Sequence, residues 1–482
     1  MLFTTPISLV AIATCMLFAV VGVWHAWRVS KRQSLDDYLT ARGSIGTGVS
    51  IATVVATLAG TWILASPPQV ALYFGVAAII GYCVGQALPM LIFPLIGNRV
   101  RRDYPLATTL SDAVGSRYGA PVRVLVSLLG LFYMGVYLTV ELTTIAKNLQ
   151  VMAGWGLLTG AAVVAVCTLA YAAWGGVRSA IFADRLQIGL IVVLLVGLTA
   201  VLYHGLGGQP FTKVRAAQPE LLTPNAAGWE FAGVLVLGIV ASNLFDNSFW
   251  ARIFACRSEA VVRRSFTIAG LCIGVILVPP SLFGLWAVGN ADLGDPNVLP
   301  FALVQAHAPA WAGIAILVLA LLLAMSTISA LFNGISGVLI GDARAVGAVG
   351  AASAVAAAGG QRTLRWARAA TVVVALPVVW LASQGHDATY LFLIANLACA
   401  AAVLPVFLGL WWRALSGWWV LVGFVLGATA GALYFPGNVE GTVTWLTVPG
   451  GQRFITSYSL AIGLSTITAV GGGHAQRLLR GT

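Results

Sequence analysis

The segment LALLLAMSTISALFNGISGVLIGD, residues 319–342, is apolar over its first half and then carries polar residues inside the same run. Four of them follow at intervals of three or four positions and share one helical face, with Thr327 beside them: Ser326, Ser329, Asn333 and Ser336. Such side chains can bond to carbonyls of their own helix or permit close helix packing. Their oxygens are also hard neutral ligands that suit an alkali cation. The segment alone leaves both interpretations open.

The composition of the whole chain indicates a membrane protein. Of its 482 residues 59% are hydrophobic and only 9% are charged, whereas a soluble domain has about 25% charged residues. Apolar runs of about 20 residues, each long enough to cross about 30 Å of hydrocarbon, recur along the sequence. We predict an all-α polytopic membrane protein, a single membrane domain over residues 1–482. About thirteen transmembrane helices are expected, at 6–27, 46–66, 72–97, 122–150, 155–174, 186–205, 230–247, 266–288, 311–341, 366–384, 389–412, 417–435 and 456–472.

The net charge of +11 follows from membrane topology rather than from a nucleic-acid partner. If the N-terminus is outside, the alternating spans place all but four of the 26 basic residues in inward loops. The four on the outward side are Lys147, Lys213, Arg215 and Arg453. This is the distribution of the positive-inside rule. The sequence therefore predicts a multi-pass protein of the cell (inner or plasma) membrane with an outward N-terminus and a cytoplasmic C-terminus.

The sequence lacks the patterns of enzymes and of cofactor sites. Its six cysteines occur singly, with no CxxC pair and no histidine cluster. It contains no phosphate-binding loop, no nucleophile elbow and no paired-carboxylate site. We therefore expect no cofactor, no enzymatic activity and no obligatory protein partner. The expected partners are the lipid bilayer, a small solute and a coupling ion.

The second predicted span, SIATVVATLAGTWILASPPQVALYFG (residues 50–75), departs from the pattern of a continuous membrane helix. Gly60 and Thr61 lie near mid-depth, and Pro67 and Pro68 remove two consecutive backbone donors. Unpaired backbone groups are costly in hydrocarbon, so broken helices occur where they line a cavity. Either this span is a kinked helix satisfied by its neighbours, or carbonyls freed at residues 56–60 face a ligand.

Two acidic residues, Glu141 and Asp246, lie within predicted spans. Ionisable groups at membrane depth are costly and usually face an interior cavity. Glu141, one turn after Tyr137, suits a functional role and a structural polar network equally well. For Asp246 a structural position near the interface is favoured, because DNSFWARIF (residues 246–254) has the pattern of a helix end.

Several segments, in this order, resemble signatures of the sodium/solute symporter family, whose members import proline, sugars, sialic acid, pantothenate, urea and other small solutes. They are SLDDYLTARG (34–43), YAAWGGVRSAIFADRLQ (171–187), FWARIFACRS (249–258), AMSTIS (324–329) and LPVFLGLWWRALSGWW (404–419). The second, with a Tyr, a Gly-Gly pair and Asp-x-x-Gln, is the most specific; Val177 after the Gly-Gly pair is a mild departure. The resemblance covers nearly the whole chain.

The resemblance implies a leucine-transporter-type core of two inverted repeats of five helices each. One extra helix precedes the core and two follow it, which divides the chain into 1–43, 44–205, 206–412 and 413–482. Solute and ion would bind near the midplane, beside the discontinuous helices that begin each repeat. The first is the break at Gly60. The implied counterpart is GIVASNLFD (238–246), interrupted at Gly238, Ser242 and Asn243.

The resemblance also assigns a sodium site and a solute site. Sodium would be held by carbonyls and hydroxyls of Ala56, Ala59, Leu323, Ser326 and Thr327. The solute would contact Thr61, Trp62, Tyr137, Glu141, Ser242 and Asn243. The implied activity is import of a small polar organic solute by alternating access, with sodium as the coupling ion.

The chain departs from the family near one of these ligands. Proline-transporting members have an Asp one residue before the second carbonyl ligand, where this chain has Leu58. We therefore expect a different sodium affinity. Asp184, in the Gly-Gly signature, remains as an inward-side acid that would assist ion release.

Two other functions stay open at this point. A proton-coupled importer would use Glu141 as its titrating group. A transporter-like solute sensor would report to a signalling partner; such proteins usually continue into a kinase region, and this chain ends at Thr482. For the solute itself, Trp62, Tyr137 and Glu141 favour an amino-acid- or urea-like molecule over a sugar.

Overall fold

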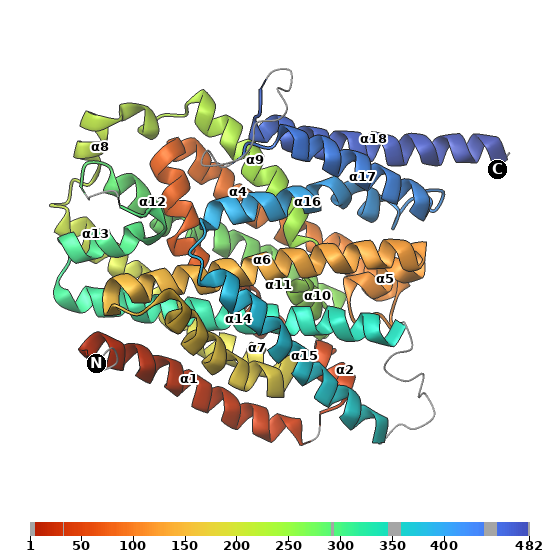
Figure 1. The fold of residues 1–482 in the computed structure, drawn as a ribbon, viewed down its shortest axis with the longest axis horizontal. Helices are drawn as coiled ribbons and strands as arrows, with labels where there is room; N and C mark the ends of the chain where they lie inside the picture. The colour runs from red at the N-terminus through yellow and green to blue at the C-terminus, as the bar shows by residue number, and fades with distance from the viewer. Residues whose placement is uncertain (1–4, 32, 291–293, 346–357, 438–450, 481–482) are drawn as a thin grey trace.

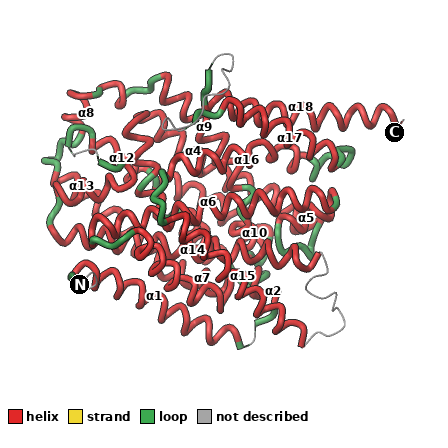
Figure 2. The backbone as a smooth tube through the Cα atoms, in the orientation of Figure 1, coloured by secondary structure: helices red, strands yellow, loops and turns green. Residues whose placement is uncertain are grey.

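The computed structural model describes residues 5–31, 33–290, 294–345, 358–437 and 451–480. Within these residues helices are the only extended regular elements (Figure 2), and an isolated bridge joins Ile45 to Cys256. The elements are α1 (Pro6–Ser30), α2 (Leu35–Thr40), α3 (Thr47–Leu58), η1 (Thr61–Leu64), α4 (Ser66–Asp103), α5 (Leu110–Tyr118), α6 (Ala120–Ala153), α7 (Leu157–Gly205), α8 (Phe211–Ala217), η2 (Pro219–Leu222), α9 (Ala226–Asn243), α10 (Asn247–Ala255), α11 (Glu259–Ile276), α12 (Val278–Ala287), η3 (Pro296–Val298), α13 (Leu299–His307), α14 (Ala310–Ala345), α15 (Ala358–Ala382), α16 (Ala388–Leu408), α17 (Gly417–Tyr434) and α18 (Phe454–Arg480).

Each of the predicted spans coincides with helical structure. In the described part of the chain, 10 helices are long and apolar enough to cross a membrane, with α11 and α12 taken together. α7 covers two predicted spans. It consists of two helices that meet at Gly176, where the backbone is not helical (φ 60°, ψ −152°). The shorter apolar helices α3 and α15 account for the two spans that remain.

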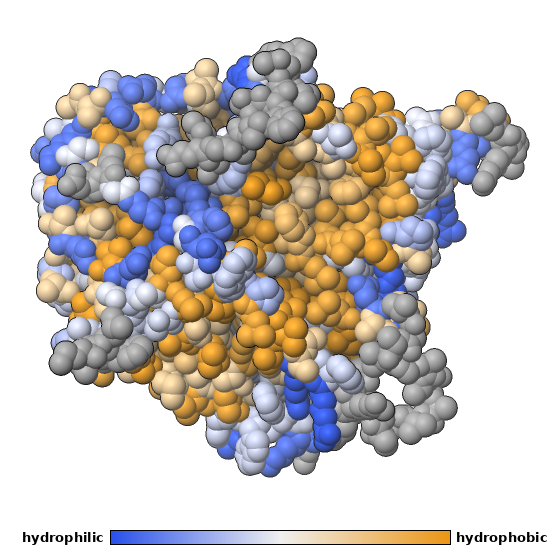
Figure 3. All heavy atoms as spheres, in the orientation of Figure 1, coloured by the Kyte–Doolittle hydropathy of each residue, from blue (hydrophilic) through white to orange (hydrophobic). Residues whose placement is uncertain are grey.

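The helices run mostly along the long axis of the molecule, and the two termini lie at opposite ends of it (Figure 1). A broad apolar band crosses the middle of one face, with hydrophilic residues gathered towards its left and right ends (Figure 3). Large apolar side chains are exposed on the outer helices, among them Leu17, Val196, Val275, Leu376 and Ile467. A surface of this kind is expected where helices face lipid tails.

The helix that contains residues 319–342, α14, lies inside the molecule. All of residues 319–338 are buried, and α14 packs against α3, α6 and α7. Small residues permit this close approach. A Cβ at Gly334 would lie 2.8 Å from the sulfur of Met134, and one at Gly337 would lie 2.8 Å from Nδ2 of Asn247. The polar face of α14 is therefore directed at other helices.

Two helices are interrupted near the middle of the molecule. α3 ends at Leu58, the 3-10 turn η1 follows, and α4 begins at Ser66. Pro67 and Pro68 lie in the first turn of α4, where backbone donors are not needed, so they begin this helix instead of kinking one. The second interruption, at residues 244–246, separates α9 from α10.

This second interruption lies later than the sequence predicts. Gly238, Ser242 and Asn243 are helical residues of α9, so the predicted unwinding over residues 238–246 is wrong for all but the last three. A side chain at Gly238 would collide with α18, which explains the glycine by packing. The side chains of Ser242 and Asn243 donate to a carbonyl earlier in α9, so they are satisfied within an intact helix.

The interpretation of the segment at Asp246 as the end of a helix is also wrong. Asp246 is fully buried and has a structural role, as the sequence favours. It begins α10 instead of ending a helix, because its Oδ1 accepts a hydrogen bond from the amide of Ser248 at 2.8 Å.

Gly176→Ala should destabilise the protein. Gly176 has φ 60°, and a Cβ there would lie 2.4 Å from the carbonyl oxygen of Tyr38. Backbone strain and collision together should cost about 1–3 kcal/mol or more, measured as a lower thermal unfolding temperature in detergent. Gly189→Ala, on the same helix, is the control, because nothing lies within 4 Å of its Cβ. Equal losses in both variants would contradict this account.

Candidate ion- and solute-binding site

The break after α3 leaves backbone carbonyls without their helical partners. In a continuous helix the amide of Gly60 would bond to the carbonyl of Ala56. It donates instead to the carbonyl of Leu58, at 3.1 Å. The amide of Thr61 is likewise diverted from the carbonyl of Thr57. The carbonyls of Ala56 and Thr57 are therefore available to groups outside α3.

Both carbonyls face hydroxyls of α14. Ser326 Oγ lies 3.1 Å from the carbonyl oxygen of Ala56, and Thr327 Oγ1 lies 3.4 Å from that of Thr57. Ser326 Oγ also lies 2.6 Å from Oδ1 of Asp184 on α7. A hydroxyl carries one proton, so it can donate to only one of these two acceptors at a time. Three oxygens from three helices thus meet where a cation would offset their mutual repulsion.

Asp184 is fully buried and joins α7 to three other helices. Its Oδ2 accepts hydrogen bonds from Thr53 Oγ1 at 2.5 Å and from Arg252 Nη2 at 3.0 Å. Arg252, 1% exposed, also donates to Thr53 Oγ1 and to the carbonyl of Ser248, each at 3.0 Å. Asp184 touches a predicted sodium ligand directly.

The other predicted sodium ligands surround the end of α3. Ala59 is buried and has left the helix, with φ −85° and ψ 81°, so its carbonyl lies outside the helical ladder. Leu323 is buried on α14, one turn before Ser326 and on the same face. Thr327 faces the carbonyl of Thr57, a residue that the sequence analysis did not select. The structure thus places Ser326 beside the carbonyl of Ala56 and Thr327 beside that of Thr57. The ligands expected at Ala59 and Leu323 stay predictions.

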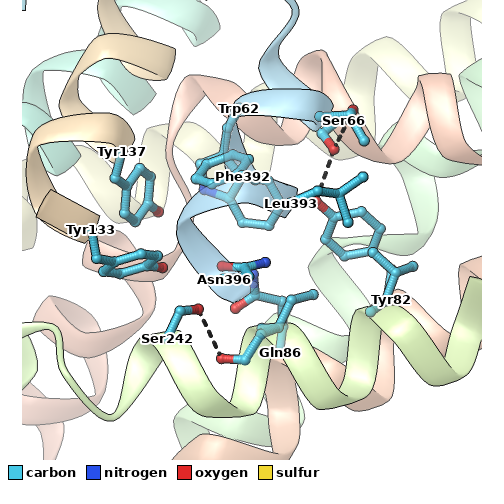
Figure 4. A pocket seen from close by; sticks show the side chains of 13 residues that line it. Trp62, Ser66, Tyr82, Gln86, Tyr133, Tyr137, Ser242, Phe392, Leu393 and Asn396 are labelled. Atoms are coloured by element: carbon cyan, nitrogen blue, oxygen red, sulfur yellow. Dashed lines mark hydrogen bonds between the residues drawn. The ribbon is translucent and has the colours of Figure 1, made fainter. Parts of the chain in front are cut away.

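A pocket lies beside this region, with an empty volume of about 400 Å³ that includes its open part. Aromatic rings from η1, α4, α6 and α16 line it (Figure 4): Trp62, Tyr82, Tyr133, Tyr137 and Phe392. The ring of Phe392 packs edge-on against those of Tyr137 and Trp62, with centroid distances of 5.2 and 5.9 Å. The polar lining residues are Ser66, Gln86, Ser242, Thr389 and Asn396. All of these side chains are uncharged.

The predicted solute contacts divide into two groups. Trp62, Tyr137 and Ser242 line the pocket, whereas the other three lie behind its wall: Thr61, Glu141 and Asn243. Glu141 accepts hydrogen bonds from the backbone amides of Thr61 at 2.7 Å and Trp62 at 3.4 Å. Nδ2 of Asn243 lies 3.4 Å from Oε1 of the lining residue Gln86.

Most of the polar lining residues were not predicted from the sequence. Gln86 and Asn396 are single amides within apolar spans, and a polar side chain at membrane depth is a signal for a cavity. Tyr133 lies one turn before the selected tyrosine of α6, on the same face. Ser66 and Thr389 carried no such signal, because hydroxyls are common in membrane helices.

A chain of hydrogen bonds begins at the pocket wall and leads towards the surface. The hydroxyl of Tyr82 donates to Ser66 Oγ at 2.9 Å, and Ser66 Oγ lies 2.7 Å from Thr389 Oγ1. Thr389 Oγ1 also lies 2.5 Å from Oε1 of Gln69. Nε2 of Gln69 donates in turn to Oδ2 of Asp387 at 2.8 Å. These bonds hold the start of α4 against the start of α16.

The chain continues into the loop before α13. Asn297 Nδ2 donates to Asp387 at 3.2 Å and to Asp295 at 2.7 Å, and Asp295 pairs with Lys147 Nζ at 2.7 Å. Burial raises the pKa of Asp295, but hydrogen bonds from Lys147 and Asn297 outweigh this and lower the pKa below its usual value. The Asp295 side chain is 40% exposed, so the bonds connect the pocket wall with the surface.

Solved structures of membrane transporters share this fold. A sodium-coupled sialic acid symporter in its substrate-bound outward-open state matches with a TM-score of 0.76, at 16% identity over 97% of this chain and 98% of that chain. Mhp1, a nucleobase-cation-symport-1 family transporter in a closed conformation with bromovinylhydantoin bound, matches with a TM-score of 0.60, at 13% identity over 92% of this chain and 95% of that chain. The predicted all-α fold of the leucine-transporter type is therefore confirmed. The repeat boundaries at 44–205 and 206–412 stay predictions.

The profile of the sodium:solute symporter family matches residues 38–427, and the chain belongs to that family. The spermidine transporter DUR31 of Candida albicans is 26% identical over 443 residues, covering 90% of this chain and 80% of that protein. The probable urea active transporter 1 of Schizosaccharomyces pombe is 22% identical over 67% of this chain and 54% of that protein. The urea-proton symporter DUR3 of Oryza sativa is 20% identical over 90% of this chain and 63% of that protein. The chain thus spans less than two thirds of both urea relatives. It is a multi-pass membrane transporter and not an enzyme.

Arg252→Met should destabilise the protein strongly, because it leaves Asp184 buried without its cation. Removing one partner of a buried ion pair costs about 3–5 kcal/mol, measured as a lower thermal unfolding temperature in detergent. Arg453→Met is the control: Arg453 pairs with Glu230 and is 57% exposed, and an exposed pair contributes about 0–1 kcal/mol. A similar small loss in both variants would contradict the role given to Arg252.

Proposed function

We propose that the protein couples inward sodium flow to the import of a small nitrogen-bearing solute by alternating access. This proposal rests on one observation: the Ser326 hydroxyl lies within hydrogen-bonding distance of both the Ala56 carbonyl and the Asp184 carboxylate, but it has only one proton to donate. Neutral oxygens with one carboxylate form a suitable ligand set for a hard monovalent cation. The sialic acid symporter that shares the fold is described as sodium-coupled, which supports the choice of ion.

The pocket lining supports a solute with amine or amide groups. Aromatic faces attract cationic groups, and the amides of Gln86 and Asn396 can both donate and accept hydrogen bonds. The relatives are named for spermidine and urea, two nitrogen-bearing solutes. We therefore favour an amino-acid-, urea- or amine-like molecule over a sugar.

Coupling requires only linked equilibria. Sodium held between the carbonyl of Ala56 and the hydroxyl of Ser326 would tie α3 to α14 and favour the arrangement in which Trp62 completes the pocket. Sodium shifts the equilibrium between the two states of alternating access only by the difference in its affinity for them. With the N-terminus outside and the C-terminus in the cytoplasm, as the basic loops favour, a membrane potential adds about 2.3 kcal/mol per charge per 100 mV to the drive for import.

A second candidate is proton-coupled import. The rice relative is named a urea-proton symporter, and two buried carboxylates, Asp184 and Glu141, lie beside the ion and solute sites. Uptake into proteoliposomes separates the two functions. Proton coupling predicts uptake that changes with pH and is unaffected when choline replaces sodium. Sodium coupling predicts uptake that is lost when choline replaces sodium and does not follow pH.

The double substitution Ser326→Ala with Thr327→Ala should reduce sodium-stimulated uptake at least tenfold, because a monovalent cation would lose two oxygen ligands. Ser336→Ala is the matched control: its hydroxyl is buried on the same helix but donates to the Phe332 carbonyl at 2.7 Å. Uptake into proteoliposomes in sodium and in choline chloride measures the effect. Unchanged sodium dependence in the double variant would remove the site assignment.

A thermal-shift screen of the purified protein should identify the solute class. We expect urea, polyamines or amino acids to raise the unfolding temperature more in sodium chloride than in choline chloride, because binding to the folded state stabilises it. Stabilisation by sugars alone would overturn the proposed solute class.

A further inference from the structure

The carboxylate of Glu141 replaces two hydrogen bonds that the first broken helix does not form. In a continuous helix the amide of Thr61 would bond to the carbonyl of Thr57, and that of Trp62 to the carbonyl of Leu58. Both amides donate to Glu141 instead, at 2.7 Å to Oε2 and 3.4 Å to Oε1. One side chain of α6 thus accepts the donors that would otherwise extend α3 by another turn.

The carbonyls released in this way take up functional contacts. The Thr57 carbonyl faces the hydroxyl of Thr327 on α14. The Leu58 carbonyl accepts a hydrogen bond from Nε1 of the Trp62 side chain at 3.0 Å. This second bond crosses the break and fixes the indole that lines the pocket. The ion ligands and the solute pocket are therefore linked through the same few backbone groups.

The surroundings of Glu141 fit a structural acceptor rather than a solute ligand. Its side chain is fully buried and is not among the pocket-lining residues. Among the described residues Glu141 forms no ion pair, so backbone amides supply its compensation. Its carboxylate also explains Gly60, whose φ of −92° is ordinary: a Cβ there would lie 2.1 Å from Oε1 of Glu141.

We propose that Glu141 is a positioning residue that keeps the first helix broken and thereby couples the ion site to the solute pocket. Its contacts are with the backbone between the two sites, at Thr61 and Trp62. Without it, the amides of residues 61 and 62 would compete for the carbonyls of residues 57 and 58, and the arrangement that sodium recognises would be lost. This inference rests on the proposed sodium-coupled function.

The test compares Glu141→Ala, Glu141→Gln and the unaltered chain in two sodium-dependent readouts that need no known solute. The first is the apparent sodium affinity, from thermal unfolding in mixtures of sodium chloride and choline chloride. The second is the effect of sodium on labelling of a pocket cysteine, Asn396→Cys, by a thiol reagent after replacement of the six native cysteines. We expect Glu141→Ala to weaken sodium affinity at least tenfold and to abolish the sodium effect on labelling. Glu141→Gln keeps one acceptor oxygen, so its sodium response should lie between those of Glu141→Ala and the unaltered chain.

Thr143→Val is the matched control for a general loss of stability. Thr143 lies on the same helix and its buried hydroxyl donates to the Ala382 carbonyl at 3.3 Å, away from the break. This variant should lower the unfolding temperature without changing either sodium readout. The same loss of sodium response in Thr143→Val would overturn the positioning role.

The remaining outcomes separate this inference from the proposed function. If the unaltered chain shows no response to sodium, the proposed sodium coupling is wrong, and the positioning role that rests on it is overturned as well. If the unaltered chain responds and Glu141→Ala responds equally, only the positioning role is overturned. If the unaltered chain responds to pH instead of sodium and Glu141→Gln removes that response, Glu141 is the titrating group of a proton-coupled transporter and the positioning role is overturned.

Discussion

A backbone amide inside the hydrocarbon layer needs an acceptor, and this requirement at residues 60–62 shapes the centre of the molecule. Because α3 stops at Leu58, three amides and several carbonyls lose their partners within one turn. The amides turn to the carbonyl of Leu58 and to the carboxylate of Glu141, while carbonyls turn to the hydroxyls of α14. The replacements from α6 and α14 bind the broken helix to both of these neighbours. A single interruption thereby releases a set of carbonyls from the helical ladder and forms one wall of the pocket.

The buried charges are arranged around the two interruptions. Arg252 belongs to α10, which begins directly after the second interruption, and it reaches Thr53 of α3, which ends at the first. Asp184 lies between them and contacts Ser326 as well. A buried carboxylate is costly unless other groups compensate its charge, and the partners of Asp184 come from α3, α10 and α14. The pair therefore ties both broken helices to the helix that carries the hydroxyls.

The division between charged and uncharged surroundings matters for selectivity. The pocket is lined by aromatic rings, hydroxyls and amides, while Glu141 and Asp184 are engaged behind or beside it. Under the proposed function, these uncharged groups replace the hydration of a neutral nitrogen-bearing solute by hydrogen bonds. Amide side chains can both donate hydrogen bonds to such a solute and accept hydrogen bonds from it. The hydrogen bonds from Tyr82 through Asp387 to Asp295 begin at this lining and lead from the pocket wall towards the surface.

Hydropathy and charge order are properties of the chain itself, and they determined the membrane class, the helical spans and the position of the first break at Gly60. Ser326, and through the family resemblance its partner Ala56, were also found from sequence, because a polar stripe in an apolar helix and a glycine with two nearby prolines are local signals. The tertiary structure alone decided the rest. It places the second break at residues 244–246 and pairs Arg252 with Asp184. It also brings Glu141 into hydrogen-bonding distance of a backbone amide 80 residues earlier in the chain. Partners this distant depend on how the helices pack, and neither the segment around Arg252 nor that around Glu141 shows in its own sequence which residue it meets.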